Sequence, residues 1–302
     1  MAEFTPPPTI DSGAAVRWQA HAPALSPWLH EEVGRRMEDR LQWIMQKPEA
    51  WCSWQPLRAG LAAHQLVAER YPQAECYVVE GNAQHASVLR EALVAPWWTP
   101  GRWRQAKLHW VPPATGGVQM LWANMALHSD PNPQQLLHRW HDMLEVDGYL
   151  MFSCLGPDTL KELRAVYAEQ GWPVASHEFT DMHDWGDMLV QAGFAEPVMD
   201  MERITLSYSS AEKLRGELRE LGRNLHPGRF AGLRGRKWLA QLDLSLARQL
   251  ARAEEDGRLV VTFEVIYGHA FKPQPKVRMQ GESIVSIEQM QQMLRGSRTR
   301  GE

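Results

Sequence analysis

The chain has few cysteines and no long apolar run. Only Cys52, Cys76 and Cys154 occur among its 302 residues, and no CxxC pair or Cys/His cluster is present. A disulfide framework or a structural zinc site is therefore not expected, and a reducing compartment such as the cytoplasm is favoured. No stretch of about 18 consecutive apolar residues occurs, so no membrane-spanning helix is expected. The opening MAEFTPPPTI lacks the apolar core of a signal peptide.

An excess of charge of either sign is also missing. The formal net charge is -4, which argues against general nucleic-acid binding through bulk positive charge. Hydrophobic residues make up 44% of the chain and charged residues 23%, so a sizeable core is expected and global disorder is not. The length suits one large α/β domain, or one domain with an insertion.

Short apolar segments alternate with amphipathic ones in the first half of the chain. This order predicts a mostly parallel sheet with right-handed crossovers, whose ligands lie outside the carboxyl ends of the strands. A preceding helix is expected over 28–45, where apolar residues recur on one face. The expected strands are 50–54, 75–80, 106–112, one within 116–128, and 147–155, and the expected helices are 59–70, 83–93 and 133–144.

The second half adds two long strands separated by helices. Helices are expected at 156–170, 181–194, 211–221 and 238–254, and strands at 196–210 and 257–273. About seven strands result, which predicts an α/β fold with the seven-stranded, Rossmann-like sheet of class I methyltransferases and a helical lid inserted at about 211–256. The predicted organisation is an irregular arm over 1–27, the domain over 28–273 and a tail over 274–302.

A glycine-rich turn is missing where a nucleotide-binding unit would carry one. The segment from Glu49 to Asn82 has the order strand, turn, helix, strand, but its turn reads WCSWQPLRAGL. Pro56 lacks an amide donor, Arg58 adds a positive charge, and only Gly60 remains as a glycine. The acid that ends the second strand, Glu80, could accept both hydroxyls of a ribose or could be a solvated strand end.

Several segments resemble the malonyl-acyl-carrier-protein O-methyltransferases of biotin synthesis. They are LWANMALHSDPNPQQLLHRWHDMLEVDGYLMFSCLGPDTLKELR, HEFTDMHDWGDMLVQAGFAEPVMDMERITLSY, LRELGRNLHPGRFAGLRGR and FEVIYGHAFKP. The resemblance is good over 120–273 and weak over 28–120. It implies methyl transfer from S-adenosylmethionine to the carboxylate of malonyl on an acyl carrier protein, with no catalytic side chain and no metal required. The altered turn leaves open a degenerate homologue that binds or regulates without turnover.

The same resemblance suggests cofactor-binding residues. They are Gly60 in the turn, Glu80 after the second strand, and Asn124 and Leu127 after the fourth. Ordinary turn packing is the alternative for the last two. The segment AVRWQAHA in the N-terminal arm could fold over the cofactor.

Substrate contacts are expected on the last strand and in the inserted lid. Tyr267 and His269 point the same way on a strand and could donate hydrogen bonds to the substrate, or form a half-buried polar pair. Residues 213–237 contain eight positive and two negative side chains, which could attract an acidic carrier protein or form a solvated face. A nucleic-acid role for this segment is weaker because aromatics are not interleaved with it. The lid arginines proposed to bind substrate are Arg219, Arg223, Arg229 and Arg234.

Histidines also fall near the expected strand ends and in the inserted region. His177 and His183 lie six residues apart among aspartates, which raises a metal-binding alternative. Helix capping by Thr180 or Asp181 explains the same pattern without a metal.

Overall fold

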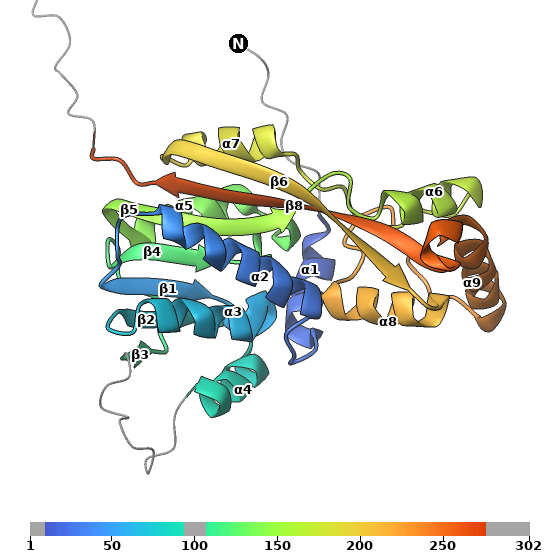
Figure 1. Ribbon diagram of the computed structural model, residues 1–302, viewed down its shortest axis with the longest axis horizontal. Coiled ribbons are helices and arrows are strands. Elements are labelled where there is room, and N and C mark those ends of the chain that lie inside the picture. The colour runs from blue at the N-terminus through green and yellow to red at the C-terminus, as the bar shows by residue number, and fades with distance from the viewer. Residues whose placement is uncertain (1–9, 94–106, 276–302) are drawn as a thin grey trace, which may run out of the picture.

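The computed structural model describes residues 10–93 and 107–275, which form one central sheet with helices on both faces (Figure 1). The strand order is β3-β2-β1-β4-β5-β8-β6, and the short β7 pairs with β8. The strands β1 to β5 run parallel, and β8 is antiparallel to both β5 and β6. The strands are β1 (Ala50–Trp54), β2 (Glu75–Val79), β3 (Leu108–His109), β4 (Val118–Ala123), β5 (Leu144–Leu155), β6 (Ala195–Tyr208), β7 (Ala251–Arg252) and β8 (Arg258–Phe271).

The helices divide between the two faces of the sheet and a lobe at one end. In Figure 1, α2 and α3 cover one face, and the long strands β6 and β8 extend to α6, α8 and α9 at the right. The helices are α1 (Ser12–His21), α2 (Trp28–Arg40), α3 (Pro56–Arg70), α4 (Ala83–Leu93), α5 (Pro133–Met143), α6 (Lys161–Glu169), α7 (Met182–Gln191), α8 (Ala211–Leu221) and α9 (Arg236–Leu250). No helix of the described ranges is long and apolar enough to cross a membrane.

The sheet separates two apolar cores. Val33 and Met37 of α2 pack on one face, and Trp140 of α5 and Trp185 of α7 pack on the other, all of them almost fully buried. Burial of such side chains is the main stabilising term of the fold. Because β1 lies between β2 and β4 with both faces covered, its sequence AWCSW is continuously apolar apart from one serine.

Helix starts follow ordinary capping chemistry. The side chain of Asn132 accepts from the Gln135 amide ahead of α5, and Asp181 accepts from the amides of His183 and Asp184 ahead of α7. The predicted capping role of Asp181 is therefore confirmed.

The predicted fold is confirmed, with corrections to individual elements. The arm was expected to be irregular, but Ser12–His21 is helical because Asp11 caps it and Ala14 and Ala15 bury against Leu225. The helix after β1 begins at Pro56 instead of residue 59, and α6 begins at Lys161 instead of 156. The third strand is only two residues long, and an eighth strand, β7, follows α9. The tail from 276 onward lies outside the described residues.

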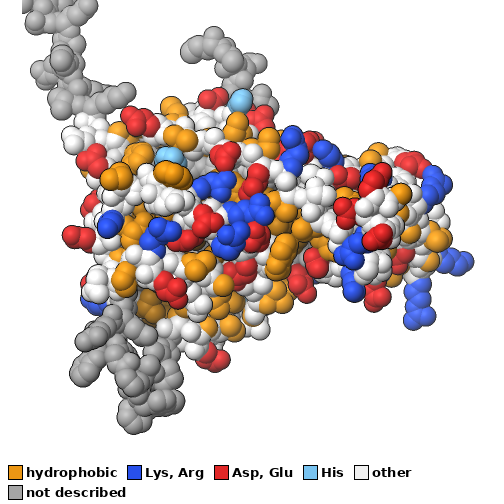
Figure 2. Space-filling view, in the orientation of Figure 1, with side chains coloured by type: hydrophobic (Ala, Val, Ile, Leu, Met, Phe, Trp, Pro, Cys, Tyr) orange, Lys and Arg blue, Asp and Glu red, His pale blue; other side chains and the backbone are white. Residues whose placement is uncertain are grey.

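The surface over α2 carries charges of both signs. Arg35 and Arg36 share the carboxylate of Glu32, and Arg40 pairs with Asp200 of β6. Figure 2 shows this mixture of blue and red near the middle of the view. Exposed pairs of this kind contribute little to stability, and they leave no surface of a single charge on this face.

Candidate functional site

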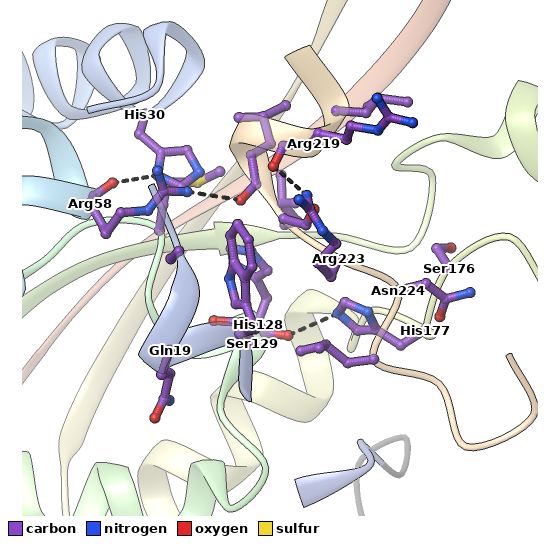
Figure 3. Close-up of a pocket in the computed structure, with 18 of the residues that line it drawn as sticks. Gln19, His30, Arg58, His128, Ser129, Ser176, His177, Arg219, Arg223 and Asn224 are labelled. Carbon is purple, nitrogen blue, oxygen red and sulfur yellow. Dashed lines mark hydrogen bonds between the residues drawn. The ribbon is translucent and has the colours of Figure 1, made fainter. Parts of the chain in front are cut away.

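A cavity of about 600 Å³ lies at the carboxyl ends of β1, β2 and β4. Its wall includes Trp54 after β1, Glu80 after β2 and Asn124 after β4. Helix α1 contributes Trp18 and Gln19 to the same wall, and α8 contributes Arg219 (Figure 3). The position agrees with the rule that ligands of open α/β sheets bind outside the carboxyl ends of the strands.

The turn after β1 differs from a glycine-rich cofactor turn. Gln55 adopts a left-handed conformation with φ 48°, which a glycine would adopt at lower cost. The amides of Arg58 and Ala59 donate to the carbonyl of Gln55 at 3.1 and 2.9 Å, and Pro56 has no amide proton. These three positions therefore offer no free backbone donor to a ligand.

Gly60 serves the contact between α3 and α2 instead of the cavity. It has φ 120°, and an added Cβ would lie 3.1 Å from Oε2 of Glu31 and 3.2 Å from the carbonyl oxygen of His30. The Glu31 carboxylate accepts from the amides of Ala62 and Ala63 at 3.1 and 3.0 Å. Gly60 is absent from the described cavity wall. The structure therefore gives no support to its predicted cofactor contact, because α2 covers this part of the turn.

Arg58 extends into the cavity and joins three parts of the chain. Its guanidinium donates to the carbonyl of Leu25 at 3.0 Å and to that of Leu221, at the end of α8, at 3.3 Å. It also lies 5.4 Å from the ring of Trp18. Burial lowers the pKa of Arg58 to about 10, so the side chain is still charged at neutral pH. A sulfonium bound here would meet a nearby positive charge.

Glu80 has the features of a ribose ligand. Its Oε1 accepts from the Asn82 amide at 3.0 Å, whereas Oε2 is buried with no hydrogen-bond partner among the described residues. Burial raises the pKa of the Glu80 carboxyl. A buried acceptor without a partner is costly, and a pair of ligand hydroxyls would satisfy it. The cavity therefore fits the nucleoside half of S-adenosylmethionine, whereas the turn after β1 offers its methionine half few donors.

Asn124 lines the cavity but is already engaged. Its Nδ2 donates to the carbonyls of His30, at 2.8 Å, and Ala59, and its Oδ1 accepts from Ser153 at 2.6 Å. These bonds hold the turns after β1 and β4 together. Leu127 is buried in the core on the α5 face and does not line the cavity. Neither residue has a free group to offer a cofactor.

The two predicted contacts on the last strand lie away from the cavity. The Tyr267 hydroxyl donates to Glu202, and the guanidinium of Arg40 lies 3.8 Å from its ring. His269 packs near the ring of Phe271, and burial lowers its pKa. Neither residue is part of the described cavity wall, and the structure gives no support to their predicted substrate contacts.

The four predicted lid arginines divide into two pairs. Arg219 and Arg223 line the cavity, and Arg223 also lies 5.0 Å from Trp18. Arg229 and Arg234 line an adjoining hollow of about 490 Å³, where Arg229 pairs with Asp11 at 2.7 Å.

A buried polar cluster was not predicted as a site, although two of its histidines fall near strand ends. Nδ1 of His128, Nδ1 of His177 and Oγ of Ser176 are buried without hydrogen-bond partners in the described part of the chain, and all three residues line the cavity. Nε2 of His177 lies 3.3 Å from the carbonyl oxygen of His128 (Figure 3). Burial lowers the pKa of His177 to about 4, so at neutral pH it is an uncharged hydrogen-bonding group.

The metal alternative brings no further residues together. His183 lies exposed at the start of α7, whereas His177 is in the cavity wall. No three His, Cys, Asp or Glu side chains within 10–93 and 107–275 are arranged to hold a metal ion.

Comparisons with known proteins agree with the geometry. No protein-family model matches the chain. Malonyl-[acyl-carrier protein] O-methyltransferase of Gallionella capsiferriformans is 38% identical over 266 residues, which cover 85% of this chain and 88% of that protein. The proteins of the same name from Laribacter hongkongensis and Methylovorus are 36% and 35% identical, and each match covers 83% of this chain and 84% of the relative. The YcgJ protein of Bacillus subtilis superposes with a TM-score of 0.51 at 11% identity over 81% of this chain and 99% of its own.

Proposed function

The chain belongs to the malonyl-acyl-carrier-protein O-methyltransferase family, and from this premise we propose that it methylates the free carboxylate of a malonyl group carried by an acyl carrier protein. The family's cofactor is S-adenosylmethionine. The observation that carries the proposal is the extent of the similarity: relatives of this name match across more than four fifths of the chain. The buried Oε2 of Glu80, which has no hydrogen-bond partner among the described residues and lies in the cavity wall, adds independent support.

The reaction mainly requires the protein to position the methyl donor and the carboxylate. S-adenosylmethionine, when bound, supplies a methyl group on a positively charged sulfur. A carboxylate is already ionised at neutral pH, so no general base is needed to activate it. Alignment of the two groups and exclusion of water lower the barrier. Residues of α1, α8 and α9 wall the cavity around the strand ends, which would hold the two groups together and exclude water.

Polar groups of the cavity would take separate roles. Glu80 would hold the ribose hydroxyls. His128 and Ser176 would orient the malonyl group, since hydrogen bonds from uncharged donors fix a carboxylate without forming an ion pair. In neutral His177 the Nε2–H donates to the His128 carbonyl, so its Nδ1 is left as an acceptor beside them. Arg219 and Arg223, nearer the rim, would attract the anionic substrate.

The carrier protein would approach from the side of the inserted lid. Acyl carrier proteins are acidic, and the arginines of α8 and the loop after it give this region its positive charge. The three cysteines are all free and buried, which is compatible with a cytoplasmic location.

A second candidate rests on the turn after β1. Because the amides of Arg58 and Ala59 are already bonded, Pro56 has none, and Arg58 extends into the cavity, the turn favours a homologue that binds the carrier protein without methylating it. The two candidates differ in turnover, not in fold.

Growth of a biotin-requiring strain that lacks its own malonyl-carrier methyltransferase separates the candidates. The proposal predicts growth without biotin when this chain is expressed, and loss of growth for Glu80→Ala expressed at the same level. Absence of growth from a folded wild-type chain, together with capture of carrier protein carrying no methyl ester, would establish the second candidate.

A further inference from the structure

The hollow beside the main cavity is lined by positive charge. It lies between α1, the loop after α6 and the loop after α8, and measures about 490 Å³. Its described lining contains no aspartate or glutamate. The basic residues that line it are Arg17, His21, Arg223, Arg229 and Arg234.

These arginines differ in whether their guanidinium groups already have an ion-pair or hydrogen-bond partner. Arg229 is paired with Asp11 at 2.7 Å, and Arg223 donates to the carbonyl of Gly222 at 2.9 Å. Arg17 and Arg234 have no ion-pair or hydrogen-bond partner in the described part of the chain. Arg234 instead packs over aromatic rings, 3.9 Å from Trp238 and 4.5 Å from Phe230. Packing of this kind orients the guanidinium plane and leaves its edge free for an anion.

The hollow adjoins the main cavity. Six residues line both spaces and form the boundary between them. They are Trp18, Tyr167, Ala175, Arg223, Asn224 and Leu225. A ligand with an anionic end in the hollow would cross this boundary to extend a neutral chain toward His177 and Ser176, which line the main cavity.

We propose that the hollow is a phosphate subsite for a phosphopantetheine arm, with Arg17 and Arg234 as its principal ligands. The inference rests on the proposed function, since that arm carries the malonyl thioester on an acyl carrier protein. Its phosphodiester is the only fixed charge along it, and arginine forks match phosphate oxygens. The amide and thioester parts of the arm suit the shared, mixed polar and apolar wall beyond. The same residues would bind the phosphate of any small molecule that fits, so the test compares sources of phosphate.

Binding measured by calorimetry tests the subsite without methyl transfer. The ligands are 4′-phosphopantetheine, pantetheine and inorganic phosphate, titrated into wild-type protein, Arg17→Ala, Arg234→Ala and the control Arg252→Ala. Arg252 is exposed and outside both cavity walls. We expect phosphopantetheine to bind roughly tenfold or more tightly than pantetheine, as one or two charge-assisted hydrogen bonds imply. Each hollow variant should lose about tenfold of that advantage, and Arg252→Ala none.

Three results would overturn the proposal. They are equal binding of phosphopantetheine and pantetheine, an unchanged phosphate advantage in both hollow variants, and inorganic phosphate binding as tightly as phosphopantetheine. Arg234→Lys, which keeps the charge and much of the packing, serves if Arg234→Ala fails to fold, and it should retain part of the advantage. Because no step requires turnover, a catalytically silent chain that passes these tests would contradict the proposed function and leave the subsite intact.

Discussion

Replacement of Glu80 by glutamine separates the residue's role in binding from its effect on stability. The variant keeps an acceptor for the Asn82 amide, which bonds to Glu80 at 3.0 Å, removes the charge and replaces the second carboxylate oxygen by an NH2 donor. A hydrogen bond to a charged group contributes about 1.5–3 kcal/mol. If the carboxylate holds a ribose, Glu80→Gln should therefore weaken nucleoside binding by about 10- to 100-fold.

The stability of the same variant should change in the opposite direction. Burial raises the pKa of Glu80 in the folded state above its value in the unfolded state. The folded protein therefore has its full stability below the unfolded-state pKa, where Glu80 is neutral. It loses stability as the pH rises through the folded-state pKa, because a charge is then buried. Glutamine stays neutral at every pH. At pH 7.5 the variant should have the higher free energy of unfolding, and the difference should vanish near pH 4, where both side chains are uncharged.

Two measurements test these expectations for Glu80→Gln. Titration calorimetry with S-adenosylhomocysteine gives the binding change, and urea unfolding at pH 4, 5.5 and 7.5 gives the stability difference. Glu75→Gln, at a carboxylate outside the cavity, is the matched control and should leave binding unchanged. Unchanged affinity in Glu80→Gln would refute the ribose role, and a variant less stable than wild type at pH 7.5 would refute the account of the buried charge.

Three further predictions concern stability and reactivity. Gly34→Ala should destabilise the fold by about 2 kcal/mol, because the new Cβ would lie 2.4 Å from the Cβ of Ala63. Gly186→Ala, in α7 with open space around it, should stabilise the fold by about 0.5–1 kcal/mol. Urea unfolding of both variants tests this pair. Burial lowers the pKa of His64 from 6.5 to about 4, so on acidification the unfolded state gains a proton first and the free energy of unfolding falls as the pH drops through that range. His64→Gln should reduce the slope of the free energy of unfolding against pH by up to about 1.4 kcal/mol per pH unit. An unchanged slope would contradict this prediction. Burial raises the pKa of Cys52 to about 12, and all three cysteines are buried. Iodoacetamide should therefore modify none of them in the native protein and all three in denaturant. Rapid labelling of the native protein would contradict this prediction.

The sheet could be predicted from the sequence because its signals are local. Continuous apolar runs such as AWCSW and YLMFSCL mark strands buried on both faces, and the helices between them carry one apolar side. The helix α1 was missed although Asp11 caps it locally through the Ala14 amide. The rest of its support is distant: Asp11 bonds to Leu225 through its backbone and to Arg229 through its side chain. A stretch of alanines between prolines gives no such information.

The lining of the cavity could be predicted only in part, for the same reason. Glu80 was identifiable because it ends a strand next to a predicted ligand site. Tyr267 was misplaced because strand alternation gives the side of the sheet but not what covers it, and here α2 brings Arg40 over the ring. His177 reaches the cavity through a loop far along the chain, so no spacing in the sequence indicates its position beside His128.

Methylation in vitro tests the central claim most directly. Purified chain is incubated with S-adenosylmethionine and malonyl-loaded acyl carrier protein, and the intact carrier is weighed by mass spectrometry, with acetyl-loaded carrier as the control that has no free carboxylate. We predict that the malonyl carrier gains the mass of one methylene group, that the acetyl carrier gains nothing, and that Glu80→Gln slows the gain. An unmodified malonyl carrier after prolonged incubation with folded protein and saturating cofactor would contradict it.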